Sequence, residues 1–514
     1  MRTIIKREFL DNILSFKFIA CVLVAIVLVV FSTFFLAGDY RNRLEDSHRG
    51  EANAQEYLRK IPVYSYLEVG IYKKPSPLSI FISGIERETG NSVTVTHREI
   101  PTELKGGLIK NEFSQIFSFF DLSSVIVIVF TVLAMLLSYN SISGEKEEGM
   151  LSLVLSNSVP RFKLLLAKYL GGLLSIVFPL TICFSIASLI VLFSKGVSLS
   201  KGFWPAVFLF YLLTVLYLSS VLLIGIFVST RTKAAFNSLL ILLAFYVITI
   251  FLLPVSIADF ARKAELKKAT NYENNAANLS REVQDKTAAS VQKIPVKRDW
   301  ASMERRGERF ILKRMNPEAT IEYYKQFHEI RERIMIDYAR KAYDLKQKDF
   351  QIADRIYGIK NLLLMFLPSA GFEKASELAA GTGRKNASRF FEQVFTYWQQ
   401  YVRYLEDKNA FSLRYFYPYS DSLSPAEKAF LNSLSAADAK ERLSLLQSER
   451  KKFNQKEYDF LNLNDMPVLT YYEPHFGERI KGILPNVLVL FFYSLLFFLL
   501  AHFSFARYDP RMKF

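Results

Sequence analysis

The sequence has few of the residues from which reactive or metal-binding sites are built. It contains only two cysteines, Cys21 and Cys183, and both lie inside apolar runs, which excludes a disulfide framework and a thiolate metal cage. The five histidines lie far apart, and no second histidine follows His328 and Glu329 at the spacing of a zinc protease. We therefore expect no metal site.

Motifs for acyl transfer and nucleotide binding are also missing. No Gly-x-Ser-x-Gly sequence marks a nucleophile. The run Gly381-Thr382-Gly383-Arg384-Lys385 lacks the spacing and the Gly-Lys-Ser/Thr ending of a phosphate-binding loop, and we interpret it as a helix stop. The chain is therefore not expected to be an enzyme, to hydrolyse nucleotide by itself or to carry a cofactor.

Charged residues are scarce within the long apolar runs. Asp121 and Asp259 lie only at the outer ends of two of these runs. Ion-driven carriers usually place ionisable groups near the centre of the membrane. The scarcity of charge argues against such a carrier and indicates that energy is supplied from elsewhere.

Long apolar runs dominate what is present. Of the 514 residues, 51% are hydrophobic and 22% are charged, with 65 Lys and Arg against 49 Asp and Glu. This composition indicates a multi-pass membrane protein with large aqueous segments. Runs of about 18 or more apolar residues predict six transmembrane helices, at residues 18–37, 118–139, 169–194, 204–229, 236–258 and 484–506.

Basic residues beside the span ends predict that both termini are cytoplasmic. Those on the cytoplasmic side are Arg2, Lys6, Arg7, Lys17, Arg161, Lys163, Lys168, Arg231, Lys233, Arg507, Arg511 and Lys513. Lys195 and Lys201, in a short loop on the opposite side, count against this orientation. We expect a protein of the bacterial cytoplasmic membrane, with an amphipathic surface helix at residues 1–17 and a cytoplasmic tail at 507–514.

Two segments lie outside the membrane in this topology, residues 38–117 and 259–483. In the smaller segment, residues 63–72 and 92–97 are β-branched or alternate in polarity, which predicts some strand. The fold class is therefore a mainly α membrane protein with six transmembrane helices, a small α/β outer segment and a large, mostly helical outer domain.

The larger outer segment is long enough for a core of its own. Helical periodicity runs from Pro317 to about residue 355 and from Ser424 onward, and the polar run 261–299 is a third candidate helix. Residues 367–383 predict a short helix that either lies on the outer membrane surface or packs within the outer domain. The basic excess of this segment fits either contact with anionic headgroups or a solvated face.

The cytoplasmic loop at residues 140–168 is the most informative segment. An acidic cluster lies between two glycines, and a short apolar piece and a basic re-entry into the third span follow it. This pattern predicts a short helix across the cytoplasmic face whose carboxylates pair with basic side chains of a partner. A plain connector between two spans is the alternative.

The loop resembles the signature of type-2 ABC transporter permeases, in which a Glu-(Lys/Arg)-Glu-x-Gly-Thr-Leu run precedes an arginine element and a lysine before the third span. The matching positions are Glu145, Lys146, Glu147, Gly149, Leu151, Arg161 and Lys168, and Met150 replaces the usual threonine. The resemblance extends along the chain to the closing run Phe505-Ala506-Arg507-Tyr508-Asp509-Pro510-Arg511. Its long outer segments make the chain similar to permeases of nitrous-oxide-reductase maturation and of bacterial gliding.

The resemblance implies a dimer of identical or homologous permease protomers, with two separate ATPase subunits beneath it that hydrolyse ATP. The predicted coupling residues are Gly144, Glu145, Lys146, Glu147, Glu148, Gly149, Met150, Leu151, Arg161 and Lys168. The three glutamates among them are expected to contact the ATPase, and Arg161 is expected to hold the loop against its own protomer. Membrane lipids are the other expected partners and nucleic acid is not; cargo and substrate-binding residues are not predicted.

The expected function is therefore that of the permease of an ATP-driven exporter. An ATPase-driven mechanotransmission complex, which moves the outer domain without transporting a solute, shares every sequence feature of the exporter. A membrane sensor with a ligand-binding outer domain is a further alternative. It is disfavoured because no cytoplasmic segment exceeds about 30 residues, which is too few for an output domain.

Overall fold

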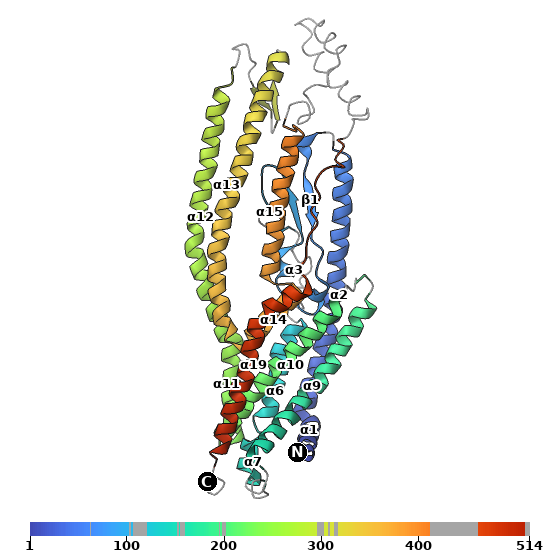
Figure 1. Cartoon of the computed structure of the whole chain (residues 1–514), viewed down its shortest axis with the longest axis vertical. Coiled ribbons are helices and arrows are strands. Elements are labelled where there is room, and N and C mark those ends of the chain that lie inside the picture. Colours follow the sequence, from blue (N-terminus) through green and yellow to red (C-terminus); the bar gives the residue numbers. More distant parts are fainter. Residues whose placement is uncertain are drawn as a thin grey trace.

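The computed structural model describes residues 1–61, 63–101, 104–105, 121–151, 154, 160–194, 196–197, 202–295, 303–306, 309–312, 317–411 and 461–508. The molecule is elongated, with a bundle of long helices at one end and an outer domain at the other (Figure 1). Helix α1 (Arg2–Ile13) and the end of the last span lie at the same end of the bundle. The helix predicted from Ser424 onward lies outside the described residues.

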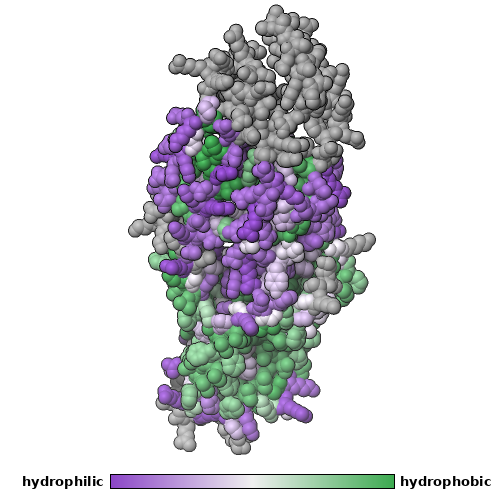
Figure 2. Space-filling model, turned by 45° about the horizontal axis from the view of Figure 1, so that its top comes forward, coloured by the Kyte–Doolittle hydropathy of each residue, from purple (hydrophilic) through white to green (hydrophobic). Residues whose placement is uncertain are grey.

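Six helices are long and apolar enough to cross a membrane. They are α2 (Phe16–Arg59), the second span (Leu122–Glu147), α9 (Arg161–Phe193), α10 (Phe203–Arg231), the fifth span (Ala235–Ala264) and α19 (Phe476–Ala506). Apolar residues form a band over the bundle, and hydrophilic residues cover the outer domain on the face shown in Figure 2. The prediction of a mainly α membrane protein with six transmembrane helices is confirmed.

Two of the six helices continue without a break into the outer domain. Helix α2 is 44 residues long and runs to Arg59, beyond the predicted end of its span at residue 37. The fifth span begins with α11 (Ala235–Tyr246), passes through the π-helical segment η4 (Val247–Leu252) and continues as α12 (Leu253–Gln292). A change from apolar to polar residues ends the membrane-spanning part of such a helix but not the helix itself.

The second and fifth spans each contain a π-helical segment. Pro254 has no N–H, and its ring crowds the carbonyl group one turn earlier, which accounts for the wide turn of η4 just before it. The second span contains η3 (Ile126–Phe130) between α5 (Leu122–Val125) and α6 (Thr131–Ser138). The hydroxyl of Tyr246, the last residue of α11 before η4, donates to the carbonyl oxygen of Ile128 in η3 at 3.2 Å, so the second and fifth spans are bonded to each other beside these irregular segments.

The two outer segments share one hydrophobic core. Strands β1 (Val69–Tyr72) and β2 (Ser92–Val95) pair antiparallel, with Val69 opposite Val95. Helix α15 (Arg384–Asp407) presents large side chains to this sheet at steps of three and four: Phe390, Val394, Tyr397, Trp398, Tyr401 and Leu405. The strands predicted in the smaller segment are confirmed. The core predicted for residues 259–483 alone is instead built from both segments, because α15 buries its apolar face on the strands.

Helices α12 and α13 (Pro317–Met365) pack along each other as a long pair beside this core (Figure 1). Ion pairs join the two helices at their exposed edge, between Lys286 and Asp337 and between Lys341 and Glu282, each at 3.7 Å. Strands β3 (Met303–Arg306) and β4 (Arg309–Leu312) form an antiparallel hairpin between the two helices in the chain. The sequence pattern did not predict this hairpin.

Helix α14 (Pro368–Ala380) connects the outer domain to the bundle. Fully buried Phe372 stacks on Tyr217 of α10, with ring centroids 4.8 Å apart. The face that carries Phe372 and Ala375 is buried in the core of the bundle against α10 and α19, whereas the sequence predicted a helix on the membrane surface or within the outer domain. Gly381 adopts φ 72° and ends the helix in the left-handed conformation, so the interpretation of the glycine run as a helix stop is confirmed.

Candidate functional site

The acidic segment of the loop predicted at residues 140–168 forms the short helix α7 (Ser143–Glu147), at the end of the bundle furthest from the outer domain (Figure 1). The Ser229 hydroxyl of α10 accepts hydrogen bonds from the N–H groups of Ile142 and Ser143, at 3.0 and 2.9 Å. Gly149 then adopts φ 72°, a backbone conformation that glycine permits without strain. The start of α7 is therefore fixed to the fourth span.

A buried lysine joins three elements at this face. Nζ of Lys168, on α9, lies 2.8 Å from Oε1 of Glu145 on α7 and 3.4 Å from Oε1 of Glu8 on α1. The Lys168 side chain is only 3% exposed. Burial raises the pKa of Glu8, although the Lys168 charge opposes the rise. Glu145 therefore connects α7 with α1 and α9 inside the chain.

Close packing of α1 on α9 depends on Gly171. A Cβ at this position would lie 2.8 Å from Cβ of Glu8 and 3.4 Å from the Ile5 carbonyl oxygen. Phe9 packs edge-on against Phe178, with ring centroids 6.3 Å apart. The amphipathic N-terminal helix thus has its apolar face against the third span.

The other charged residues of α7 bind the ends of helices. Nζ of Lys146 donates to the carbonyl oxygens of Thr230, at 2.5 Å, and Thr232, at 3.1 Å, where α10 ends. Oε2 of Glu147 accepts a hydrogen bond from the N–H of Ala235 at 3.0 Å, where α11 begins. Each charge has the sign that the helix dipole favours at that end. Helix α7 is thereby bonded to the fourth and fifth spans.

Arg161 begins α9 and reaches the last turn of α19. Its Nη1 donates to the carbonyl oxygen of Phe505 at 3.3 Å and to that of Ala506. A cation at the C-terminal end of a helix is favourable for the same electrostatic reason. These contacts lie within one chain and tie the end of the loop to the sixth span.

The predicted coupling residues divide into an exposed and a buried set. The exposed residues are Glu147, Glu148, Gly149 and Met150. Lys146, Leu151 and Lys168 are buried, and Gly144, Glu145 and Arg161 are half-buried. Residues 152–153 and 155–159 of the loop lie outside the described residues.

Sequence reasoning missed Glu8, Ser229 and Ala235. Glu8 lies three residues after Ile5, on the apolar face of α1, and a carboxylate at that place was a usable signal for a buried partner. Ser229 and the N–H of Ala235 carry no such signal. Their roles arise only when α7 packs on the two helix ends.

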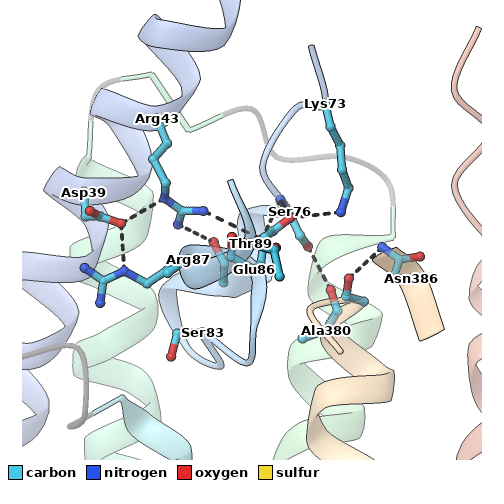
Figure 3. A network of polar contacts seen from close by, with 12 residues as sticks. Asp39, Arg43, Lys73, Ser76, Ser83, Glu86, Arg87, Thr89, Ala380 and Asn386 are labelled. Carbon is cyan, nitrogen blue, oxygen red and sulfur yellow. Dashed lines mark hydrogen bonds and ion pairs between the residues drawn. The ribbon is translucent and has the colours of Figure 1, made fainter. Parts of the chain in front are cut away.

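A second polar network lies at the joint between the bundle and the outer domain (Figure 3). Oδ2 of Asp39, on α2, lies 2.9 Å from Nε of Arg43 and 3.1 Å from Nε of Arg87. The Glu86 carboxylate, on α3 (Glu86–Thr89), lies 3.5 Å from Nζ of Lys73 and 3.8 Å from Nη1 of Arg43. We call these five residues the outer joint. None of their side chains is more than 19% exposed.

The outer joint is continuous with the turn between α14 and α15. The Ser76 hydroxyl donates to the Ala380 carbonyl oxygen at 2.8 Å, and the N–H of Ile85 donates to the Thr382 carbonyl oxygen at 3.1 Å. Gly84 has φ 50°, and a Cβ there would lie 2.7 Å from the Thr382 carbonyl oxygen. The first span, the small outer segment and the α14–α15 turn therefore form one bonded unit.

Comparison with known proteins identifies a family. A family model described as ABC-2 family transporter protein matches residues 2–330. The matched region contains α1, α7 and the first five spans. No curated protein matches the chain. Within the described residues, no three His, Cys, Asp or Glu side chains form a group able to hold a metal ion.

Proposed function

Because the chain belongs to the ABC-2 transporter family, we propose that it is the permease of an ATP-driven exporter, in which two copies form the channel and separate ATPase subunits dock on the cytoplasmic face. Family membership supports the permease assignment, and six apolar helices support a multi-pass membrane protein. The position of α7 carries the rest of the proposal. This helix lies at the end of the bundle and is bonded to the third, fourth and fifth spans, and Lys168 of the third span also pairs with Glu8 of α1.

The proposed docking surface consists of Glu147, Glu148 and Met150. All three are exposed, and Met150 has 40% of its surface accessible. Two carboxylates beside a flexible apolar side chain suit a groove of the ATPase that has basic walls and an apolar floor. Glu145, in contrast, pairs with Lys168 and serves to transmit movement.

The spans offer two routes from this surface to the outer domain. A movement of α7 is transmitted to α11 through the hydrogen bond of Glu147, and the fifth span continues into α12 without a break. A push on α1 reaches α2, which follows it in the chain and ends in the outer domain. The hydrogen bond from Tyr246 to Ile128 joins the second and fifth spans beside η3 and η4, and these π-helical segments supply a place where the two spans bend together, since such turns interrupt regular helix bonding.

The proposed dimer is consistent with the surface of the bundle. In the first, fifth and sixth spans, only 28%, 17% and 17% of the most apolar window is buried within a single chain. In the proposal, part of this surface contacts the second protomer and the remainder contacts lipid. The protein lies in a bacterial cytoplasmic membrane with α1 and the end of α19 on the cytoplasmic side, and cargo leaves toward the outer domain.

Charge reversal of Glu148 tests the docking surface. Within the described residues Glu148 has no ion pair, so Glu148→Lys is expected to leave folding intact. We expect the variant to lose ATPase subunits that co-purify with the wild-type permease and to lose ATP hydrolysis with them. The matched control is Glu406→Lys, the same change at an exposed position of the outer domain. Equal ATPase recovery from Glu148→Lys and wild type would refute docking at this surface.

One observation favours a mechanotransmission complex as the second candidate. Both α2 and the fifth span enter the outer domain as unbroken helices, and the outer joint bonds α2 to the rest of that domain. Such a construction moves an outer domain whether or not a solute crosses the membrane. Reconstitution of the permease and ATPase in vesicles separates the two candidates: ATP-dependent outer-domain movement without solute flux supports mechanotransmission, and flux supports export.

A further inference from the structure

A cavity of about 560 Å³ opens in the outer domain, between the small outer segment and α13. One wall comes from the turn after β2, and the opposite wall comes from one face of α13. Its lining residues are Ser65, Leu67, Glu68, Thr96, His97, Arg98, Glu99, Ile100, Met335, Tyr338, Ala339, Ala342, Tyr343 and Lys346. This volume falls within the range of about 300–1,000 Å³ that is usual for small-molecule sites.

A buried carboxylate fixes one edge of the cavity. Glu332 of α13 is fully buried, and its oxygens lie 2.7 Å from Nε2 of His97, 2.8 Å from Nε of Arg98 and 2.6 Å from Nη2 of Arg98. Burial alone would raise the pKa of Glu332, but the hydrogen bonds from His97 and Arg98 outweigh it and lower this pKa to about 2. The ionised carboxylate therefore holds the cavity-lining turn against α13.

The lining combines an apolar floor with charges of both signs. Leu67, Ile100, Met335, Ala339 and Ala342 supply the apolar part, and Tyr338 and Tyr343 supply aromatic surface. The acidic members, Glu68 and Glu99, are exposed, and the basic members, Arg98 and Lys346, are half-buried. A purely anionic ligand would meet the two carboxylates, and a purely apolar ligand would cover the carboxylates of Glu68 and Glu99 without offering them a partner.

We propose that this cavity binds a short peptide with free termini. The peptide ammonium group pairs with the carboxylates of Glu68 and Glu99, and its carboxylate pairs with Lys346 beside Arg98. Apolar peptide side chains cover the floor formed by the small and branched residues of α13 and the facing turn. The site joins α13 to the small outer segment, so an occupied cavity also stabilises their contact. It is independent of ATPase docking, which takes place at the other end of the molecule.

Equilibrium dialysis of radiolabelled trileucine against the purified full-length permease tests the proposal. We expect saturable binding of one peptide per chain, and binding about tenfold weaker or more for the same peptide with acetylated and amidated ends. Lys346→Glu is expected to weaken binding by a similar factor. Lys348→Glu, an exposed position on the same helix that does not line the cavity, is the control.

Intrinsic fluorescence locates the bound peptide. The chain has three tryptophans, and Nε1 of Trp398 donates to the carbonyl oxygen of Thr96, a cavity residue, at 2.9 Å. With Trp204→Phe and Trp300→Phe in place, trileucine is expected to shift the Trp398 emission at the concentrations that saturate dialysis. Absence of saturable binding, equal binding by the blocked peptide, equal loss in both lysine variants or an unchanged Trp398 signal would each overturn the proposal. The assay uses no ATPase, so its result does not depend on the proposed docking.

Discussion

The two ends of the helix bundle are both held by charged residues, but they use charge differently. At the end that carries α7, Lys146, Glu147 and Arg161 bind backbone groups where helices end, and two carboxylates stay exposed beside the buried pairs of Lys168. At the outer joint, carboxylates and cations pair with each other and are buried. The difference suits two tasks: a surface that receives a partner keeps accessible charge, whereas a connection that only transmits movement buries it.

The largest effect is expected where a charge is removed from the outer joint. Glu86→Gln leaves the buried Lys73 without its carboxylate and leaves Asp39 as the remaining carboxylate of the outer joint, and we expect a loss of about 3–5 kcal/mol in the free energy of unfolding of the outer domain. Thermal unfolding of the purified permease measures it. Glu45→Gln is the matched control, because the ion pair of Glu45 with Arg49 is exposed and contributes about 0–1 kcal/mol. Similar losses in both variants would remove the distinction between buried and exposed pairs.

Acid is expected to weaken the outer domain in two steps. The pKa of Glu332 in the fold is about 2 against an ordinary 4.5, so its stabilisation is present above pH 4.5 and is lost as pH falls toward 2. Burial lowers the pKa of His328 from 6.5 to about 4, so a separate loss begins as pH falls below 6.5, where the unfolded chain binds a proton that the folded chain does not. Protonation of Glu332 is expected to lower the free energy of unfolding by on the order of 3 kcal/mol.

Unfolding measured between pH 7 and pH 3 separates these steps. In Glu332→Gln the loss below pH 4.5 is expected to shrink, whereas the loss that begins near pH 6.5 remains. An unchanged acid profile in this variant would contradict the role given to the carboxylate between His97 and Arg98.

A smaller effect is expected at the ion pairs of Lys168 with Glu8 and Glu145. Lys168→Met leaves the carboxylates of Glu8 and Glu145 facing each other without a cation, and we expect a loss of about 2–3 kcal/mol and easier proteolysis of α1. ATP hydrolysis by the complex is expected to become independent of the permease. Lys163→Met, at an exposed position five residues earlier on α9, provides the control. A Lys168 variant with intact coupling would show that the network is not part of the transmission path.

The smallest effect is expected from Gly171→Ala. The added methyl group contacts Cβ of Glu8, and because the Ile5 backbone is also close, α1 must shift outward at a cost of about 1–2 kcal/mol. The permease should stay folded and lose part of its ATPase coupling. Gly482→Ala, where no atom lies within 4 Å of the added Cβ, is expected to change neither property. Equal behaviour of the two variants would show that α1 tolerates a looser fit.

The spans were predictable because a run of about 20 apolar residues is stable in the hydrocarbon core of a membrane, where its backbone groups must form hydrogen bonds within a helix. The positions where α2 and α12 end could not be predicted, since polar residues continue a helix as readily as they form a loop. The short helix α7 and its acidic character also followed from the local pattern. The bonds around this helix could not be predicted from the local pattern, because their partners are far apart in sequence. Lys168 lies 160 residues from Glu8, and Arg161 lies 344 residues from Phe505.

The outer joint shows the same limit. Asp39 and Arg43 are one turn apart on a helix and form a recognisable local pair. Nothing in the local pattern indicates that Arg87 and Lys73 complete the network, since their positions depend on how the small outer segment folds back on α2. The cavity beside α13 was hidden for the same reason, because its two walls come from segments more than two hundred residues apart.

Native mass spectrometry of the permease, purified in mild detergent from its own host together with its bound subunits, tests the central claim most directly. An ATPase assay on the same sample completes the measurement. The account predicts an assembly of two permease chains with two subunits that hydrolyse ATP, and loss of those subunits from Glu148→Lys. A single permease chain without ATPase activity, or one bound to a signalling subunit, would contradict it.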